Sequence, residues 1–72
     1  MRITDSKGFG QEIKKRRKEL GYTQQYLSDI FGMSTSFISE LENGKPTAEL
    51  DKAISLAMLL GMDLELKSRD KR

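Results

Sequence analysis

The 72-residue sequence contains no cysteine, no histidine and no tryptophan. Without cysteine no disulfide can crosslink the chain. Without cysteine and histidine, a zinc site would have to be built from carboxylates alone. The usual nucleophile–base pairs of enzymes are also missing, because the serines have no base beside them and the carboxylates are scattered over the expected helix surfaces. We therefore expect neither an enzyme nor a bound metal or cofactor.

Long apolar runs are missing as well. No stretch approaches the ~20 apolar residues of a membrane-spanning helix. The opening segment, residues 1–6, has no long apolar core of the kind that defines a signal peptide. These features predict a cytoplasmic protein that does not enter a membrane.

The chain is short enough to be a single domain over residues 1–72. A domain of this size buries only about 60% of its unfolded surface, so its own core is marginal. Since no disulfide or zinc site is expected, a core shared with a second copy is the remaining source of stability.

Charge is distributed unevenly along the chain, although the net charge is only +2. Residues 1–20 carry seven Lys/Arg against three Asp/Glu, residues 21–66 carry two against seven, and residues 67–72 carry four against one. Basic clusters are typical of proteins that bind a polyanion. The alternative is that the cluster from Lys14 to Lys18 is only the solvated face of a helix. The acidic middle argues against a protein that simply coats DNA.

Apolar spacing predicts an all-α fold of four to five short helices. The first helix is expected over roughly 7–20, the second from Gln24 after a Thr23 cap, the third after a Ser34 cap, and the fourth from a Thr47 cap to Leu60. The residues expected to face inward are Phe9, Ile13, Leu20, Leu27, Ile30, Phe31, Ile38, Leu41, Leu50, Ile54, Ala57 and Leu60.

The end of the chain follows a different pattern. Residues 62–67 alternate apolar and polar side chains with a period of two, which predicts a short strand. The basic residues 68–72 are expected to be a disordered tail. The strand has no partner in its own chain, so we expect it to pair antiparallel with a second copy in a dimer.

The second and third expected helices meet at Gly32 with a very tight connection. Such a helix-turn-helix needs a left-handed residue at the turn, which glycine supplies. It also needs a small residue midway along the first helix, where Ser28 lies. Apolar residues are needed after the turn and on the inner face, where Met33 and Ile38 lie.

At these spacings the sequence resembles the lambdoid phage repressor and Cro family, known as XRE-type regulators, over about residues 9–61. The matching segments are Lys14-Lys15-Arg16-Arg17, Leu20-Gly21-Tyr22-Thr23-Gln24, Leu27, Gly32, Ile38-Ser39-Glu40-Leu41-Glu42-Asn43-Gly44-Lys45 and Leu60-Gly61. The resemblance implies a sequence-specific DNA-binding regulator of transcription, a repressor. The homodimer expected from the C-terminal strand would set two recognition helices one turn of double-stranded DNA apart, or a multiple of it, so we expect a palindromic operator. Ser28 departs from the usual Ala but is still small.

The resemblance also implies which residues touch DNA. The third helix enters the major groove, and its base-reading positions are Ser34, Thr35, Ser36 and Glu40. Hydroxyls suit either kind of base pair, whereas a carboxylate would accept from a cytosine amine or repel a nearby phosphate. The alternative for all four is a polar solvated face, with Ser34 acting only as an N-cap.

Phosphate contacts are implied at both ends of the helix pair. Gln24 opens the second helix, where free amides favour an anion. The resemblance also implies phosphate contacts for Asn43 and Lys45, which follow the third helix, and for Phe37. Lys14 and Arg16 are further phosphate candidates, because they lie on other faces of the first helix than Arg17. For Phe37 the alternative is that the ring fills core space. Arg17 and Glu42 match a buried salt bridge of the phage repressors, so Arg17 is expected to be structural.

The C-terminal region, 50–66, resembles the small dimeric antitoxins of the HipB type. That resemblance implies autorepression of an operon and a HipA-type kinase toxin as partner. The residues expected to form the dimer are Met58, Leu59, Met62, Leu64 and Leu66. The alternatives are a dimer through the fourth helix alone with a frayed tail, a stand-alone regulator without a toxin, and a protein-interaction module that does not bind DNA.

Overall fold

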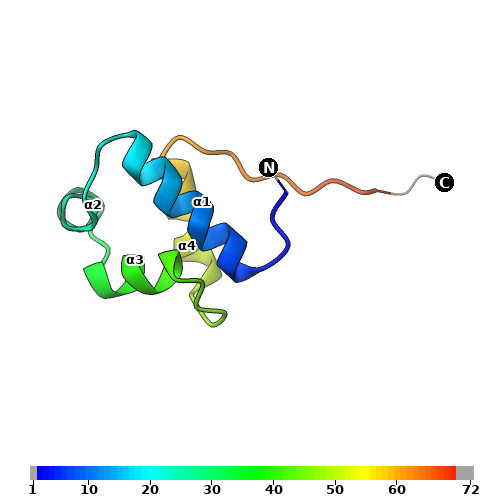
Figure 1. Ribbon diagram of the computed structural model, residues 1–72, viewed down its shortest axis with the longest axis horizontal. Coiled ribbons are helices and arrows are strands. Elements are labelled where there is room, and N and C mark those ends of the chain that lie inside the picture. The colour runs from blue at the N-terminus through cyan, green and yellow to red at the C-terminus, as the bar shows by residue number, and fades with distance from the viewer. Residues whose placement is uncertain (1, 70–72) are drawn as a thin grey trace.

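A computed structural model describes residues 2–69, which form four helices and no strand: α1 (Ser6–Glu19), α2 (Gln24–Phe31), α3 (Thr35–Glu42) and α4 (Leu50–Leu59) (Figure 1). The predicted all-helical architecture is confirmed. In this described part of the chain, no helix is both long enough and apolar enough to cross a membrane.

The first three helices begin at side-chain caps. Asp5, Thr23 and Ser34 each accept a hydrogen bond from the backbone N–H three residues later, at 2.7–3.0 Å. Such caps satisfy amides that have no partner inside the helix. The sequence had indicated Thr23 and Ser34 for these roles.

The predicted start of the fourth helix at Thr47 is wrong. Pro46 and Thr47 lie in a turn, in which the amide of Ala48 donates to the carbonyl of Lys45 at 3.3 Å. The helix begins only at Leu50, and Glu49 caps it without a side-chain hydrogen bond. A local turn around the single proline therefore delays the helix.

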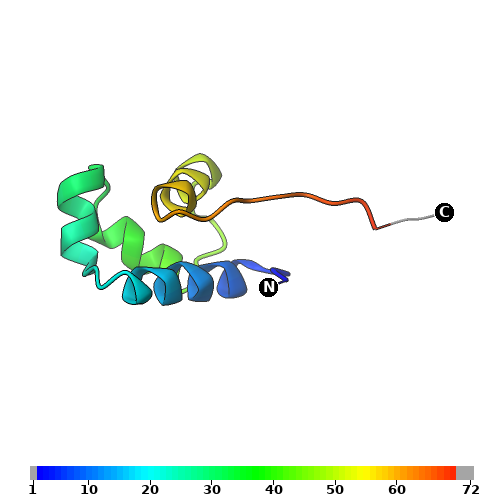
Figure 2. The ribbon, with the colours of Figure 1, turned by 90° about the horizontal axis from the view of Figure 1, so that it is seen from above.

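The helices surround one small core. α2 lies at one end of the molecule, and α3 and α4 both lie beside α1 (Figures 1 and 2). All four helices contribute to the core, and its buried side chains are Ile13, Leu27, Ile38, Leu41, Ala53, Leu56, Ala57 and Leu60. Phe9, Tyr22, Phe31, Met33, Phe37, Ala48 and Met62 pack against this cluster.

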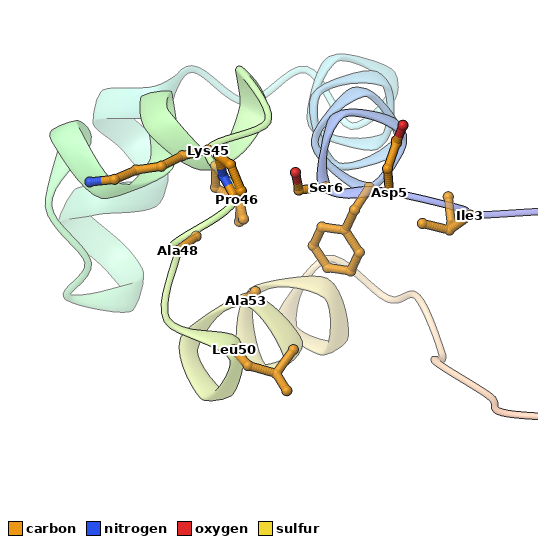
Figure 3. Close-up of a pocket in the computed structure, with 10 residues that line it drawn as sticks. Ile3, Asp5, Ser6, Lys45, Pro46, Ala48, Leu50 and Ala53 are labelled. Carbon is orange, nitrogen blue, oxygen red and sulfur yellow. The ribbon is translucent and has the colours of Figure 1, made fainter.

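The predicted inner face of α4 is right in part, because Ala57 and Leu60 are buried as expected. Leu50 was expected to be buried but is 71% exposed, whereas Ala53 and Leu56 are buried. An apolar helix offers more than one stripe at helical spacing, and packing selects among them. Here Leu50 lines an open groove of about 320 Å³ between the start of α1 and the start of α4 (Figure 3).

Two other expected core residues lie near the surface. Ile30 is 48% exposed and Leu20 is 36% exposed. α2 stands at the end of the molecule (Figure 1), and among its residues only Leu27 is fully buried. Leu20 is the C-cap of α1, so it lies beyond the last turn that packs on the core.

The expected strand over 62–67 is absent from the single chain. Residues 62–69 have no regular secondary structure and leave the helical body as an extended segment (Figure 1). A strand is defined by hydrogen bonds to a neighbouring strand. The described residues contain no strand with which this segment could pair. Residues 68 and 69 of the expected disordered tail lie in this segment, and residues 70–72 lie outside the described residues.

α1 and the end of α3 approach each other at glycines. A Cβ atom on Gly10 would collide with the carbonyl oxygen of Leu41 and lie 2.8 Å from that of Glu42. A Cβ on Gly44 would lie 2.7 Å from the Cα of Lys7. At the same crossing, the hydroxyl of Ser6 donates to the Gly44 carbonyl at 2.9 Å. Only glycine permits this backbone contact.

The crossing predicts a large effect of Gly10→Ala. The added methyl meets backbone atoms that cannot rotate away, so the free energy of unfolding should fall by about 1–3 kcal/mol or more. Gly8→Ala is the matched control, because its Cβ meets only a side-chain oxygen of Asp5 at 3.3 Å. Urea denaturation followed by circular dichroism measures both. Equal stabilities of the two variants would show that the crossing tolerates a side chain.

Candidate nucleic-acid interface

α2 and α3 are joined by a turn of three residues, 32–34. Gly32 has φ 74°, a left-handed conformation that ends α2, and its amide donates to the carbonyl of Ser28 at 3.0 Å. Glycine adopts this conformation without steric cost. Ser34 then caps α3 by accepting from the amide of Phe37. Two eight-residue helices are thus held in a helix-turn-helix.

α3 has one buried face and one exposed face. Ile38, Leu41 and Glu42 are buried. On the other side Ser36, Glu40 and Asn43 are exposed, and their spacing of four and three residues aligns them in one stripe along the helix. We call these three residues the α3 stripe. Thr35 is half-buried at its edge, and Ser34 is exposed.

The predicted base-reading residues therefore lie together around the start and the outer face of α3. Ser34 differs from the others, because its hydroxyl oxygen already accepts the capping hydrogen bond at 3.0 Å. Its hydroxyl proton is left to donate. This arrangement favours the capping role that the sequence offered as the alternative for Ser34.

A buried ion pair joins α1 to α3. The guanidinium of Arg17 donates from Nε to Glu42 Oε2 at 2.6 Å and from Nη2 to Glu42 Oε1 at 3.0 Å. The two side chains are only 10% and 2% exposed. Arg17 Nη1 also donates to the carbonyl of Tyr22 at 2.9 Å, just after α1 ends. The hydrogen bond that Arg17 donates to Glu42 is the main cause that raises the pKa of Arg17 above its usual value.

The same carboxylate also holds the start of α2. Gln24 Nε2 donates to Glu42 Oε1 at 3.0 Å. Gln24 is the first residue of α2, so the beginning of that helix lies beside the end of α3. A side-chain amide has two donor hydrogens. One remains after the bond to Glu42, and the free amides of the helix N-terminus lie at the same place.

α3 ends in a Schellman motif. The amide of Gly44 donates to the carbonyl of Leu41, and the amide of Lys45 donates to the carbonyl of Glu40, both at 3.0 Å. Gly44 has φ 84°, the left-handed conformation that this cap requires. The side chains of Lys45 and Glu40 also pair, with Nζ and Oε1 3.0 Å apart. A predicted phosphate-binding residue and a predicted base-reading residue are therefore bonded to each other.

The predicted phosphate-binding residues do not all gather at one place. Gln24, Asn43 and Lys45 lie near the end of α3. Arg16 instead donates from Nε to the carbonyl of Leu60 at 2.8 Å and lies 3.5 Å from a Glu19 oxygen. It thus binds the C-terminal end of α4, where a cation is favoured.

The two remaining candidates differ in exposure. Lys14 is exposed on α1. Phe37 is half-buried and packs against the core, with Lys52 Nζ 5.9 Å from the centre of its ring. This favours the alternative in which the ring fills core space.

Sequence reasoning missed three contacts that shape this region: the Gln24–Glu42 bond, the Arg16–Leu60 bond and the Glu40–Lys45 pair. Glu40 and Lys45 are five residues apart, so an ion pair next to a glycine cap could have been suspected. The other two join residues 18 and 44 positions apart. Nothing in their local sequence signals them.

A helix-turn-helix family model matches residues 13–67, which is most of the chain. The chain belongs to the XRE-type helix-turn-helix family. This confirms the family resemblance found in the sequence, and the two helices and the turn described above lie inside the matched residues.

Two relatives illustrate the family. The HTH-type transcriptional regulator y4mF of Sinorhizobium fredii is 31% identical over 71 residues, which cover 99% of this chain and 93% of that protein. The ImmF control region 10 kDa protein of Bacillus phage phi105 is 32% identical over 64 residues, covering 89% of this chain and 71% of that protein.

Solved structures share the fold. The complex of HipB with the O4 20mer superposes with a TM-score of 0.85 at 21% identity, covering 97% of this chain and 99% of that one. A second HipB complex, with the O2 20mer, gives the same TM-score and identity. At this identity the likeness establishes the fold alone.

The buried ion pair predicts unequal effects of two neighbouring arginines. Arg17→Ala leaves the Glu42 carboxylate buried without its cation, so the free energy of unfolding should fall by about 3–5 kcal/mol. Arg16→Ala removes one half-exposed hydrogen bond and should cost about 1 kcal/mol. Melting temperatures measured by calorimetry compare the two. If Arg16→Ala destabilised the protein as much as Arg17→Ala, the ion pair would not be the dominant contact.

Proposed function

We propose that this protein is a sequence-specific DNA-binding transcriptional regulator that places α3 in the major groove. The observation that carries the proposal is the α3 stripe of exposed polar side chains, on a helix whose opposite face is locked to α1 and α2 through Glu42. A recognition helix needs this combination, because base contacts require free side chains on a rigidly positioned helix. The names of the related regulators support the same function.

We propose that two groups of hydrogen-bond donors near α3 bind DNA phosphates. Gln24 and the amides at the start of α2 offer donors to one phosphate, and Asn43 and Lys45 offer donors to another at the end of α3. Lys14 is an exposed cation on α1 available for a further contact. Arg16 contributes less than the sequence suggested, because its guanidinium already binds α4.

Phosphate and base contacts should respond differently to mutation. Lys45→Ala should weaken binding similarly on every duplex and reduce the salt dependence of the affinity. Gln24→Ala should also weaken all duplexes alike. Thr35→Ala or Ser36→Ala should instead change the preferred sequence, with about 1–3 kcal/mol at stake per good base contact. Fluorescence anisotropy on a panel of operator variants measures both effects. A Thr35→Ala protein with the parent's sequence ranking would refute base reading by Thr35.

We further infer that the regulator is a homodimer formed through α4 and the segment 62–67. Met58, Leu59 and Leu64 are 62%, 50% and 46% exposed, and Leu66 is fully exposed. Met62 is half-buried against the core, at the point where the segment leaves it. So much apolar surface on one small domain is typical of an interface. The extended segments of two copies would pair as the antiparallel strands that a single chain cannot form.

Truncation after Gly61 tests this interface. The shortened chain should be largely monomeric, less stable and poor at binding a full palindromic operator, whose half-sites would be about 34 Å apart or a multiple of that. Sedimentation velocity gives the oligomeric state, and Leu66→Lys in the 72-residue chain is a milder test of the same surface. An intact and equally stable dimer after truncation would assign the interface to α4 alone.

A finer proposal is that the protein is an autorepressing antitoxin with a kinase-like toxin as partner. The support is the shared fold with HipB over nearly the whole of both chains. A stand-alone regulator is the competing function. Co-expression with the product of an adjacent kinase-like gene separates them, because an antitoxin should co-purify with that product and suppress its toxicity. A genome without such a gene beside this one favours the stand-alone regulator.

A further inference from the structure

The Glu40–Lys45 pair lies on the surface proposed to face DNA. Lys45 Nζ is 3.0 Å from Glu40 Oε1, and the two side chains are 45% and 53% exposed. Exposed ion pairs often contribute little, but here the backbone brings the two residues together. The Schellman cap bonds the Lys45 amide to the Glu40 carbonyl, and Pro46 restricts the backbone of the residue before it. Figure 3 shows the Lys45 side chain extending away from Ala48 and Leu50.

The charges of the surrounding residues make the Glu40–Lys45 pair important for phosphate binding. Lys45 is the only Lys or Arg between residues 24 and 45, whereas Asp29, Glu40 and Glu42 are the acids of that span. Glu42 is buried and neutralised by Arg17. The ammonium of Lys45 is therefore the one cation that this span can offer to a phosphate, and in the free protein a carboxylate of the α3 stripe holds it.

We propose that Glu40 is a specificity-determining residue that competes with DNA phosphate for Lys45. When Lys45 moves to a phosphate, the carboxylate of Glu40 loses its cation while facing a polyanion. A site that presents a base amine, such as the N4 amine of cytosine, gives the carboxylate a new donor. A site without such an amine leaves it unpaired, and binding is penalised. Discrimination of this kind works by repelling wrong sequences.

This inference rests on the proposed DNA binding and adds a mechanism of specificity to it. The variant that tests it is Glu40→Gln, which keeps the size of the side chain and removes its charge. The matched control is Asp51→Asn, which changes the net charge equally but lies exposed at the start of α4 and belongs to none of the ion pairs among the described residues. Lys45→Met, alone and combined with Glu40→Gln, completes a double-mutant cycle.

The measurement is the affinity for a random duplex and for a selected operator, as a function of salt. On the random duplex, Glu40→Gln should bind several-fold more tightly at low salt. Its log–log salt slope should be steeper by up to about 0.9, the contribution of one neutralised phosphate. The affinity for the operator should increase less, so the ratio of operator affinity to random-duplex affinity should fall. Asp51→Asn should match the parent, and the affinity gained through Glu40→Gln should be smaller in the Lys45→Met background.

Three results would overturn the proposal. Equal effects of Glu40→Gln and Asp51→Asn would mean that only net charge matters. If Glu40→Gln increased the affinity by the full amount in the Lys45→Met background, the Glu40 carboxylate would repel phosphate directly and would not compete for the Lys45 ammonium. A loss of operator affinity with no change on random DNA would make Glu40 a simple base reader. If the folded parent bound no duplex at any salt concentration, the proposed function itself would fail, and the inference with it.

Discussion

The carboxylate of Glu42 lies where α1, α2 and α3 meet, and the positions of all three helices depend on its hydrogen bonds. It accepts two hydrogen bonds from Arg17 and one from Gln24, and it is almost completely buried. A buried carboxylate is tolerated only when its oxygens are satisfied, and removal of its cation costs more than the pair contributes. The interaction therefore specifies one arrangement of the helices, which a core of eight apolar side chains would define less sharply.

The geometry of the proposed DNA-binding surface depends on the hydrogen bonds of Glu42. α3 is held to α1 by the Arg17 bonds and by the glycine crossing at Gly10, and the start of α2 is held to the end of α3 through Gln24. The exposed residues of the α3 stripe are consequently carried by a helix that is fixed on its inner face. Rigid support of this kind lets short side chains such as Ser36 act at defined positions on a partner.

The two ends of the molecule differ in how many of their polar and apolar groups find partners within the single chain. Around the helix-turn-helix, the buried polar groups of Arg17 and Glu42 bond to each other and to Tyr22 and Gln24. On the α4 side, apolar side chains remain exposed and the chain continues as an extended segment without hydrogen bonds to a neighbouring strand. The helix-turn-helix end presents the proposed DNA contacts, and the α4 end is the part that we propose a second copy completes.

The sequence by itself determined the local features of this protein. Capping residues such as Thr23 and Ser34, the glycine at the turn and the spacing of Leu27, Ile38 and Leu41 act over a few residues, so a linear pattern carries them. The matching segments also indicated the family and the pair of Arg17 with Glu42.

Tertiary structure decided what depends on residues far apart. Which stripe of α4 turns inward was settled by the shape of the cavity left by the other helices, so Leu56 is buried and Leu50 is not. Arg16 was assigned to phosphate by its charge, but the end of α4 lies within reach and binds it. The pattern of residues 62–67 encoded the capacity to form a strand, but a strand requires a partner, and the single chain supplies none.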